Sequence, residues 1–205
     1  MSYRKNIKRK GFTLVELLIV IVVIGILSAM MMLSSNEAVS SAKANNIIAN
    51  LRNLKTAALA WYADNPDYVN NTQAGNADKK QLHFGDKDGR KGILSYLGNT
   101  GGEVTTVDGN DNTLVVGGFQ YVAVVVPHKN QSKEKLAGAK WYISCNIDEK
   151  NSTKNIRIRE KLAGRAKSVG LLSNRTDTDT EAAPYNGSTG GTSTGSGTTV
   201  YYLIH

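Results

Sequence analysis

The sequence has almost no cysteine, and this limits the chemistry open to it. Cys145 is the only cysteine among 205 residues. It allows no intramolecular disulfide and excludes a cysteine-based metal cluster. Apolar residues precede it, and a lone cysteine in such a setting is typical of a small buried core residue. We therefore expect Cys145 in the core, without a redox role.

Recognisable catalytic motifs are also lacking. The sequence contains no glycine-rich phosphate loop, no zinc-ligand spacing and no nucleophile elbow. Its three histidines are scattered among polar segments or lie at the chain end: His83, His128 and His205. We therefore predict that the protein is not an enzyme and needs no cofactor.

Two acidic stretches are the remaining candidates for a metal site. Asp86 with Asp88, and Asp108 with Asp111, place carboxylates at a spacing similar to that of calcium loops. Neither stretch completes a twelve-residue calcium loop, because the distal glutamate is missing. Asx-rich turns explain both stretches better. We expect no metal and keep calcium as the alternative.

Acidic residues are absent from the first eleven positions, where positive charges gather. Of the net charge of +8, five come from this segment: Arg4, Lys5, Lys8, Arg9 and Lys10. The remaining 20 basic and 17 acidic side chains give only +3. A basic protein would ordinarily suggest nucleic acid as a partner, but here the excess lies mostly in one short segment. We therefore expect no nucleic-acid partner.

A long apolar run without proline follows, from residue 12 to residue 33. As a helix its 22 positions would span about 33 Å, enough to cross a bilayer core. The basic flank places the N-terminus in the cytoplasm and the rest of the chain outside it. A cleavable secretory signal fits poorly, because Leu27 precedes the best cut at Ala29 and the run continues. A plain membrane anchor leaves Glu16 unexplained.

The residues Gly11-Phe12-Thr13-Leu14-Val15-Glu16 resemble the prepilin cleavage and methylation motif of type IV pilins and type II secretion pseudopilins. The resemblance implies a cut between Gly11 and Phe12, followed by N-methylation of Phe12. The new ammonium group of Phe12 would lie about one helical turn from Glu16. In the family, this glutamate is thought to meet the terminal amine of a neighbouring subunit and to fix the axial register, a known use of a buried ion pair.

The same resemblance implies the partners and the location. We expect processing by a prepilin peptidase/methyltransferase, insertion in the lipid of the bacterial inner membrane, and assembly on an inner-membrane platform into a filament of identical and related subunits. Pilus and secretion pseudopilus, and major and minor subunit, remain open. Many pilins carry a proline in the stretch that matches residues 30–36, and this chain has none, so whether the helix melts on assembly also stays open.

A binding module is the alternative function: a minor pilin that captures DNA or a surface ligand. It would need a basic stripe, and four lysines form a modest cluster: Lys129, Lys133, Lys135 and Lys140.

The remaining pattern predicts an α+β fold, in which a long N-terminal helix packs on an antiparallel sheet as in pilins. The helix should run from residue 14 to residue 63 and become amphipathic in its second half, with apolar residues at three- to five-residue steps. These residues are Ala38, Ala42, Ile47, Leu51, Leu54, Ala58 and Trp61. We divide the chain into a leader (1–11), a transmembrane or filament-core helix (12–35) and an exported globular domain (36–205).

Strands are expected at residues 103–107, 113–126, 140–147 and 200–204, with a turn at 108–112 and a bulge or break at Gly117-Gly118. A short helix is expected at 91–97, a second one at 156–169 that ends near Gly170, and a flexible loop at 186–198.

Overall fold

The computed structural model describes residues 11–65, 83–86, 91–98, 103–107, 110–126, 140–148, 155–176, 182–187 and 198–204, with backbone only at 33–34, 103–107 and 110–112. The chain divides into two compact units, Met1–Val39 and Ser40–His205. The predicted loop at 186–198 lies almost entirely outside the described residues.

Helix α1 (Leu14–Asp64) confirms the predicted helix to within one residue at its C-terminal end. It stops just before Pro66, which disfavours the helical conformation of the residue before it. In the second unit one face of α1 is buried, at Ala44, Ile47, Leu51, Leu54, Ala58 and Trp61 among others. The prediction was wrong at Ala38 and Ala42, which are exposed. Alanine does not predict which helix face is buried, because its small side chain is common on buried and on exposed faces alike.

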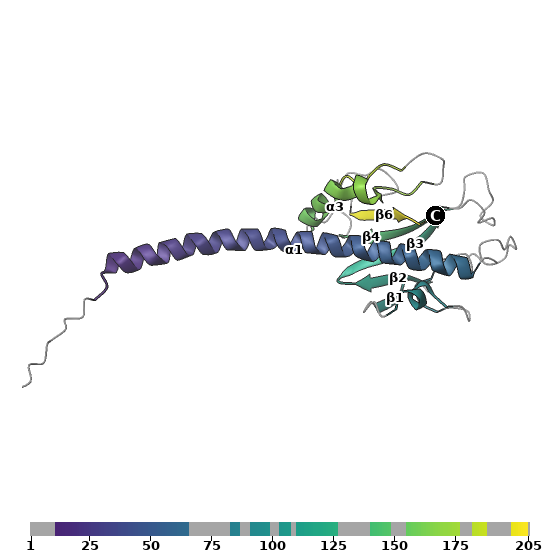
Figure 1. Cartoon of the computed structure of the whole chain (residues 1–205), viewed down its shortest axis with the longest axis horizontal. Helices are drawn as coiled ribbons and strands as arrows, with labels where there is room; N and C mark the ends of the chain where they lie inside the picture. Colours follow the sequence, from purple (N-terminus) through teal and green to yellow (C-terminus); the bar gives the residue numbers. More distant parts are fainter. Residues whose placement is uncertain are drawn as a thin grey trace, which may run out of the picture. The chain divides into compact units, whose positions relative to one another are not determined.

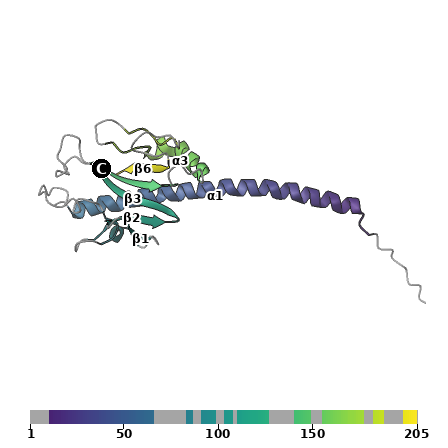
Figure 2. The ribbon, with the colours of Figure 1, turned by 180° about the vertical axis from the view of Figure 1, so that it is seen from behind.

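Among the described residues, six strands form one antiparallel sheet in the order β1-β2-β3-β4-β6-β5. Figures 1 and 2 show the second half of α1 crossing one face of this sheet. The strands are β1 (Glu103–Val107), β2 (Asn110–Val116), β3 (Phe119–Val126), β4 (Lys140–Asn146), β5 (Leu171–Leu172) and β6 (Thr199–Leu203). All four predicted strand regions are extended, but residues 113–126 form two antiparallel strands, β2 and β3, where one interrupted stretch was predicted. Strand β5, only two residues long, was not predicted.

The hairpin between β2 and β3 turns at Gly117-Gly118. Val116 pairs with Phe119, so these two glycines alone make the connection, with φ of 60° and 80°. Two positive φ values are what a tight hairpin turn requires, and glycine adopts them without strain. The predicted turn at 108–112 was too long, because β2 already begins at Asn110, which pairs with Val107. Asn and Asp favour turns, but they can still lie in a strand when a neighbouring strand supplies the backbone hydrogen bonds.

Helix α3 (Ile156–Val169) has the predicted bounds and buries the predicted face at Ile158, Leu162 and Ala166. It ends at Gly170, which has a left-handed φ of 83° and donates its N–H to the carbonyl of Ala166. The predicted short helix at 91–97 is the 3₁₀ helix η2 (Ile93–Tyr96). The apolar core lies between α1, α3 and the sheet and includes Cys145, which is fully buried as predicted.

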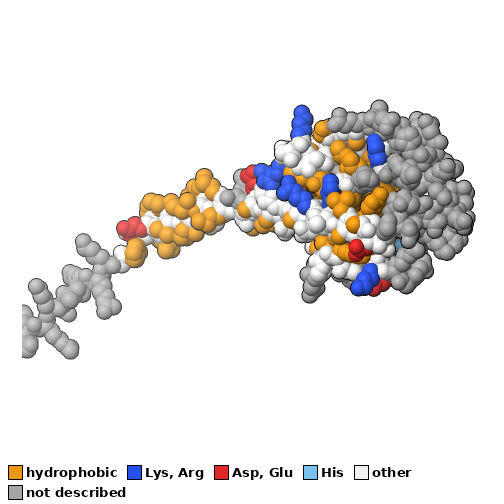
Figure 3. Space-filling model, turned by 45° about the vertical axis from the view of Figure 1, so that its right-hand side comes forward, with side chains coloured by type: hydrophobic (Ala, Val, Ile, Leu, Met, Phe, Trp, Pro, Cys, Tyr) orange, Lys and Arg blue, Asp and Glu red, His pale blue; other side chains and the backbone are white. Residues whose placement is uncertain are grey.

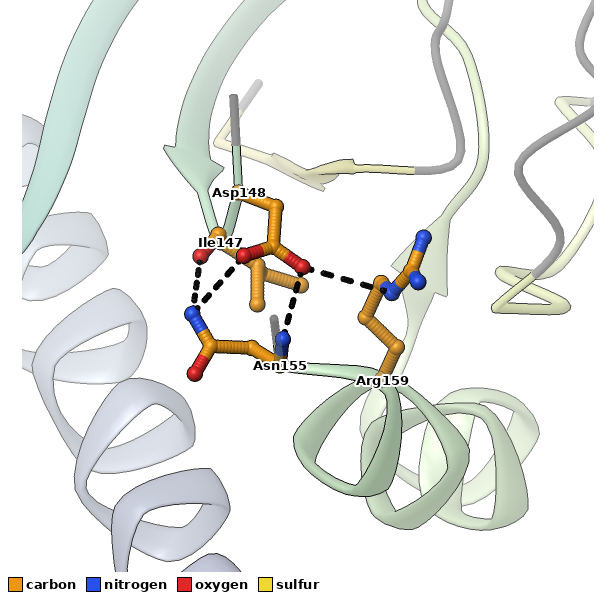
Figure 4. Close-up of polar contacts among 4 residues, drawn as sticks. All are labelled: Ile147, Asp148, Asn155 and Arg159. Atoms are coloured by element: carbon orange, nitrogen blue, oxygen red, sulfur yellow. Dashed lines mark hydrogen bonds and ion pairs between the residues drawn. The ribbon is translucent and has the colours of Figure 1, made fainter. Parts of the chain in front are cut away.

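A buried polar clasp joins the end of β4 to the start of α3 (Figure 4). Asp148 accepts hydrogen bonds from the backbone N–H of Asn155 (3.0 Å) and from its side-chain amide (2.9 Å). The same amide donates to the carbonyl of Ile147 at 2.8 Å. Arg159 Nε lies 3.7 Å from Asp148 Oδ2, and both side chains are only 2% exposed. The clasp therefore holds two opposite charges away from solvent between the end of β4 and the start of α3.

Candidate processing and assembly segment

The predicted cleavage site lies directly before the first helical turn. Residues 11–13 are not helical, and α1 begins at Leu14. The backbone N–H of Leu17 donates to the carbonyl of Thr13 at 3.2 Å, which makes Thr13 the residue that caps the helix. The Gly11–Phe12 peptide bond is therefore outside the helix, where a protease can bind the backbone.

Thr13 and Glu16 cap the helix reciprocally. The backbone N–H and the hydroxyl of Thr13 donate to Glu16 Oε2 at 2.8 and 2.9 Å. The backbone N–H of Glu16 donates to the Thr13 hydroxyl at 3.2 Å. This is the capping box, in which a threonine and a glutamate three residues later satisfy each other's free N–H groups. The carboxylate also lies at the positive end of the helix dipole.

The rest of this segment is apolar and exposed. Phe12 is 90% exposed and Leu14 86%, and every side chain described from residue 11 to residue 32 is exposed. Figure 3 shows this apolar surface with an acidic side chain at its start. Among the described residues, α1 is the one helix long and apolar enough to cross a membrane. A continuous apolar surface of this kind requires lipid or protein to cover it.

Sequence reasoning placed Glu16 correctly in an apolar helix but missed its contact with Thr13. The Thr-x-x-Glu spacing was the signal that could have revealed it. The predicted partner of Glu16, a free ammonium group at Phe12, does not exist in the uncut chain, where the Phe12 nitrogen is part of a peptide bond. The pairing therefore stays a prediction.

Comparison with known proteins bears on this segment. The family model of the prokaryotic N-terminal methylation motif matches residues 6–32, which contain Gly11, Phe12 and Glu16. A fimbrial protein of Neisseria meningitidis serogroup B (strain ATCC BAA-335 / MC58) is 33% identical over 78 residues, 38% of this chain and 46% of the relative. The protein is type IV pilin-like. No solved structure matches the chain significantly.

The pilin-like α+β fold and the N-terminal motif confirm the predicted resemblance, and both similarities favour a structural protein over an enzyme. The match is partial, because the chain spans about half the length of this curated relative. The similarity rests on the two comparisons together with the fold, since the motif match covers only residues 6–32.

The calcium candidates are only partly described in this pilin-like chain. Asp88 and Asp108 lie outside the described residues, and Asp111 lies in β2 with its side chain not described. Asp86 accepts hydrogen bonds from the Gly92 backbone N–H at 2.8 Å and from the Ser95 hydroxyl at 3.1 Å. No group of three potential metal ligands occurs in the described part of the chain.

The Asp86 contact gives a prediction about pH. The Gly92 N–H, then the Ser95 hydroxyl, lower the pKa of Asp86. A lowered pKa contributes stability above the unfolded value of about 3.9 and loses it as the pH falls through the folded value. We expect Asp86→Asn to destabilise the protein at pH 7 and to equal the wild type once the pH is below the folded pKa. Urea unfolding at several pH values measures this; a constant difference at all pH values would contradict it.

The basic cluster proposed for DNA binding is also mostly outside the described residues. Only Lys140, the first residue of β4, is described. It lines a cavity of about 380 Å³ together with Lys55 and Tyr202, and the Lys55 ammonium lies 5.2 Å from the centre of the Tyr202 ring. The binding-module alternative therefore stays a prediction and receives no structural support here.

Proposed function

We propose that the protein is the precursor of a filament subunit that is cut between Gly11 and Phe12 and assembles through its apolar helix. The observation that carries this is the combination of a capped acidic residue, Glu16, with an otherwise apolar and exposed helix beginning directly after the cut. The methylation motif and the pilin-like fold support it.

The proposed organisation is a leader (1–11), a membrane or filament-core helix (12–35) and an exported domain (36–205). The division into compact units after Val39 supports a boundary in this region. Before assembly, lipid of the bacterial inner membrane covers the apolar helix. After assembly, the same helices of neighbouring subunits cover it outside the cytoplasm.

Glu16 would act differently at each stage. Before the cut, the two hydrogen bonds from Thr13 reduce the cost of carrying a carboxylate in an apolar segment. The cut creates a cationic amine at Phe12, one residue before the capping threonine. In the filament, the amine of a neighbouring subunit and Glu16 would relieve each other's desolvation and so specify the axial register.

The partners follow from the chemistry of the segment. A prepilin peptidase/methyltransferase would cut the chain and methylate Phe12, and an inner-membrane platform would extract the subunit into a filament of identical and related subunits. A type IV pilus and a type II secretion pseudopilus both fit the described residues.

The mature N-terminus tests the proposal. Mass spectrometry of the protein from its native host should show loss of residues 1–11 and an N-methylated Phe12. The same protein from a strain without the peptidase should retain the leader and serves as the control. An intact Met1 in the peptidase-containing strain, or a terminus near Met30, would contradict the proposed cut.

A further inference from the structure

The buried stripe of α1 in the Ser40–His205 unit repeats every seven residues. Its members follow each other at alternating steps of three and four and are at most 4% exposed: Ala44, Ile47, Leu51, Leu54, Ala58 and Trp61. A slip of the helix by seven residues, about 10 Å, would again place apolar residues against the sheet. Because apolar burial is non-directional, the stripe specifies the axial position of α1 only through side-chain size.

A part-buried polar contact distinguishes the positions in the middle of this stripe. The side-chain amide of Asn50 donates to the Tyr121 hydroxyl at 3.1 Å. Tyr121 is on β3 and fully buried, and it pairs across the sheet with the fully buried Cys145. Burial raises the pKa of both the Tyr121 phenol and the Cys145 thiol, so both stay protonated and neutral. A buried hydroxyl of this kind requires hydrogen-bond partners. Cys145 is one partner within the sheet, and Asn50 is the partner that α1 supplies.

A slip in either direction removes that partner. A seven-residue slip would bring Ala57 or Lys43 to the place of Asn50. Ala57 offers no polar side-chain group to Tyr121, and Lys43 would bring a charge to a part-buried position. A four-residue slip could bring Asn46 to Tyr121, but it would then place Lys43 and Asn50 at the buried positions of Ile47 and Leu54.

We propose that Asn50 and Tyr121 are positioning residues that fix the axial register of α1 on the sheet. Trp61, whose indole N–H donates to the Lys91 carbonyl at 2.7 Å, supports the same register at the far end of the stripe. The register itself does not depend on the proposed function. The mechanical consequence of the register does rest on the proposed function. In a filament subunit, a fixed register lets force on the helix reach the globular domain without α1 sliding along the sheet.

Spin-label distances test the register directly. Labels at Asn53→Cys on α1 and Gln120→Cys on β3 occupy exposed positions, whereas the buried Cys145 is protected from labelling. In the detergent-solubilised full chain, the reference protein should show one narrow distance distribution. Tyr121→Phe should add a second population, shifted by up to about 10 Å, or broaden the distribution by several ångströms.

The matched control is Tyr142→Phe. Tyr142 is also buried on the sheet, and its hydroxyl donates to the Thr176 carbonyl at 3.2 Å, away from α1. This variant should lose stability but keep the single distance. The double variant Asn50→Leu/Tyr121→Phe should regain stability, because both polar partners are gone, while its distances stay heterogeneous.

The outcomes separate a positioning role from a merely structural one. Stability that recovers in the double variant without a return to one distance supports the proposal. A single unshifted distance in Tyr121→Phe, or the same broadening in Tyr142→Phe, overturns it. Neither result depends on whether the chain is cut after Gly11, which the mass of the N-terminus decides separately.

Discussion

Glu16→Ala should be cut and inserted in the membrane as the wild type is, yet yield at least about 100-fold fewer filaments. Removing one partner of a buried ion pair costs about 3–5 kcal/mol, and each 1.4 kcal/mol is roughly a tenfold change in an association constant. The amine of Phe12 would then be buried in the filament without its carboxylate. Immunoblots of sheared filaments and of the processed membrane form measure the two steps separately.

Three further variants make this result specific. Glu37→Ala removes another exposed acid of the same helix, outside the apolar run, and should assemble normally. Glu16→Gln keeps the size but removes the charge, and should resemble Glu16→Ala. Thr13→Val removes only a hydroxyl that contacts Glu16 and should have a smaller effect. Normal filament yield from Glu16→Ala would refute the register pair while leaving the proposed cut untouched.

Asp148→Ala should lower the free energy of unfolding by about 3–5 kcal/mol, because it leaves the buried Arg159 guanidinium without its carboxylate. It also removes the acceptor of two hydrogen bonds from Asn155, which hold the start of α3. Urea unfolding of the full chain in detergent, followed by the fluorescence of the two tryptophans, measures the change.

The control for Asp148 is an acid in a different environment. Glu160, next to Arg159 in α3, is exposed, and Glu160→Ala should change stability by less than about 0.5 kcal/mol. The double variant Asp148→Leu/Arg159→Met should lose less than Asp148→Ala, because no uncompensated charge remains. A loss in Asp148→Ala no larger than in Glu160→Ala would mean that the pair contributes nothing.

Features with a strong local signal were predictable from the sequence. Gly117-Gly118 indicated an interruption of the strand, though not that it is a hairpin turn. The spacing of Ile158, Leu162 and Ala166 before Gly170 specifies both the face and the end of α3. The cleavage motif belongs to the same group, because all its residues are neighbours in the chain. Each of these depends on contacts within a few residues.

Features that depend on tertiary contacts were not predictable. Arg159 is one of several basic residues in α3, and only the folded chain places it beside Asp148 in the interior. The two residues of β5 form a strand because β6 offers them partners, at Leu171 with Tyr202. Ala38 and Ala42 are exposed whereas Ala44 is buried, and the residue type gives no sign of this difference.

The position of the capping box has a consequence for the order of events. All three of its hydrogen bonds join Thr13 to Glu16, and both residues lie after the proposed cut. Loss of residues 1–11 therefore leaves the helix starting at the same residue with the same cap. Proteolysis therefore requires no refolding of this end of the helix before the subunit can assemble.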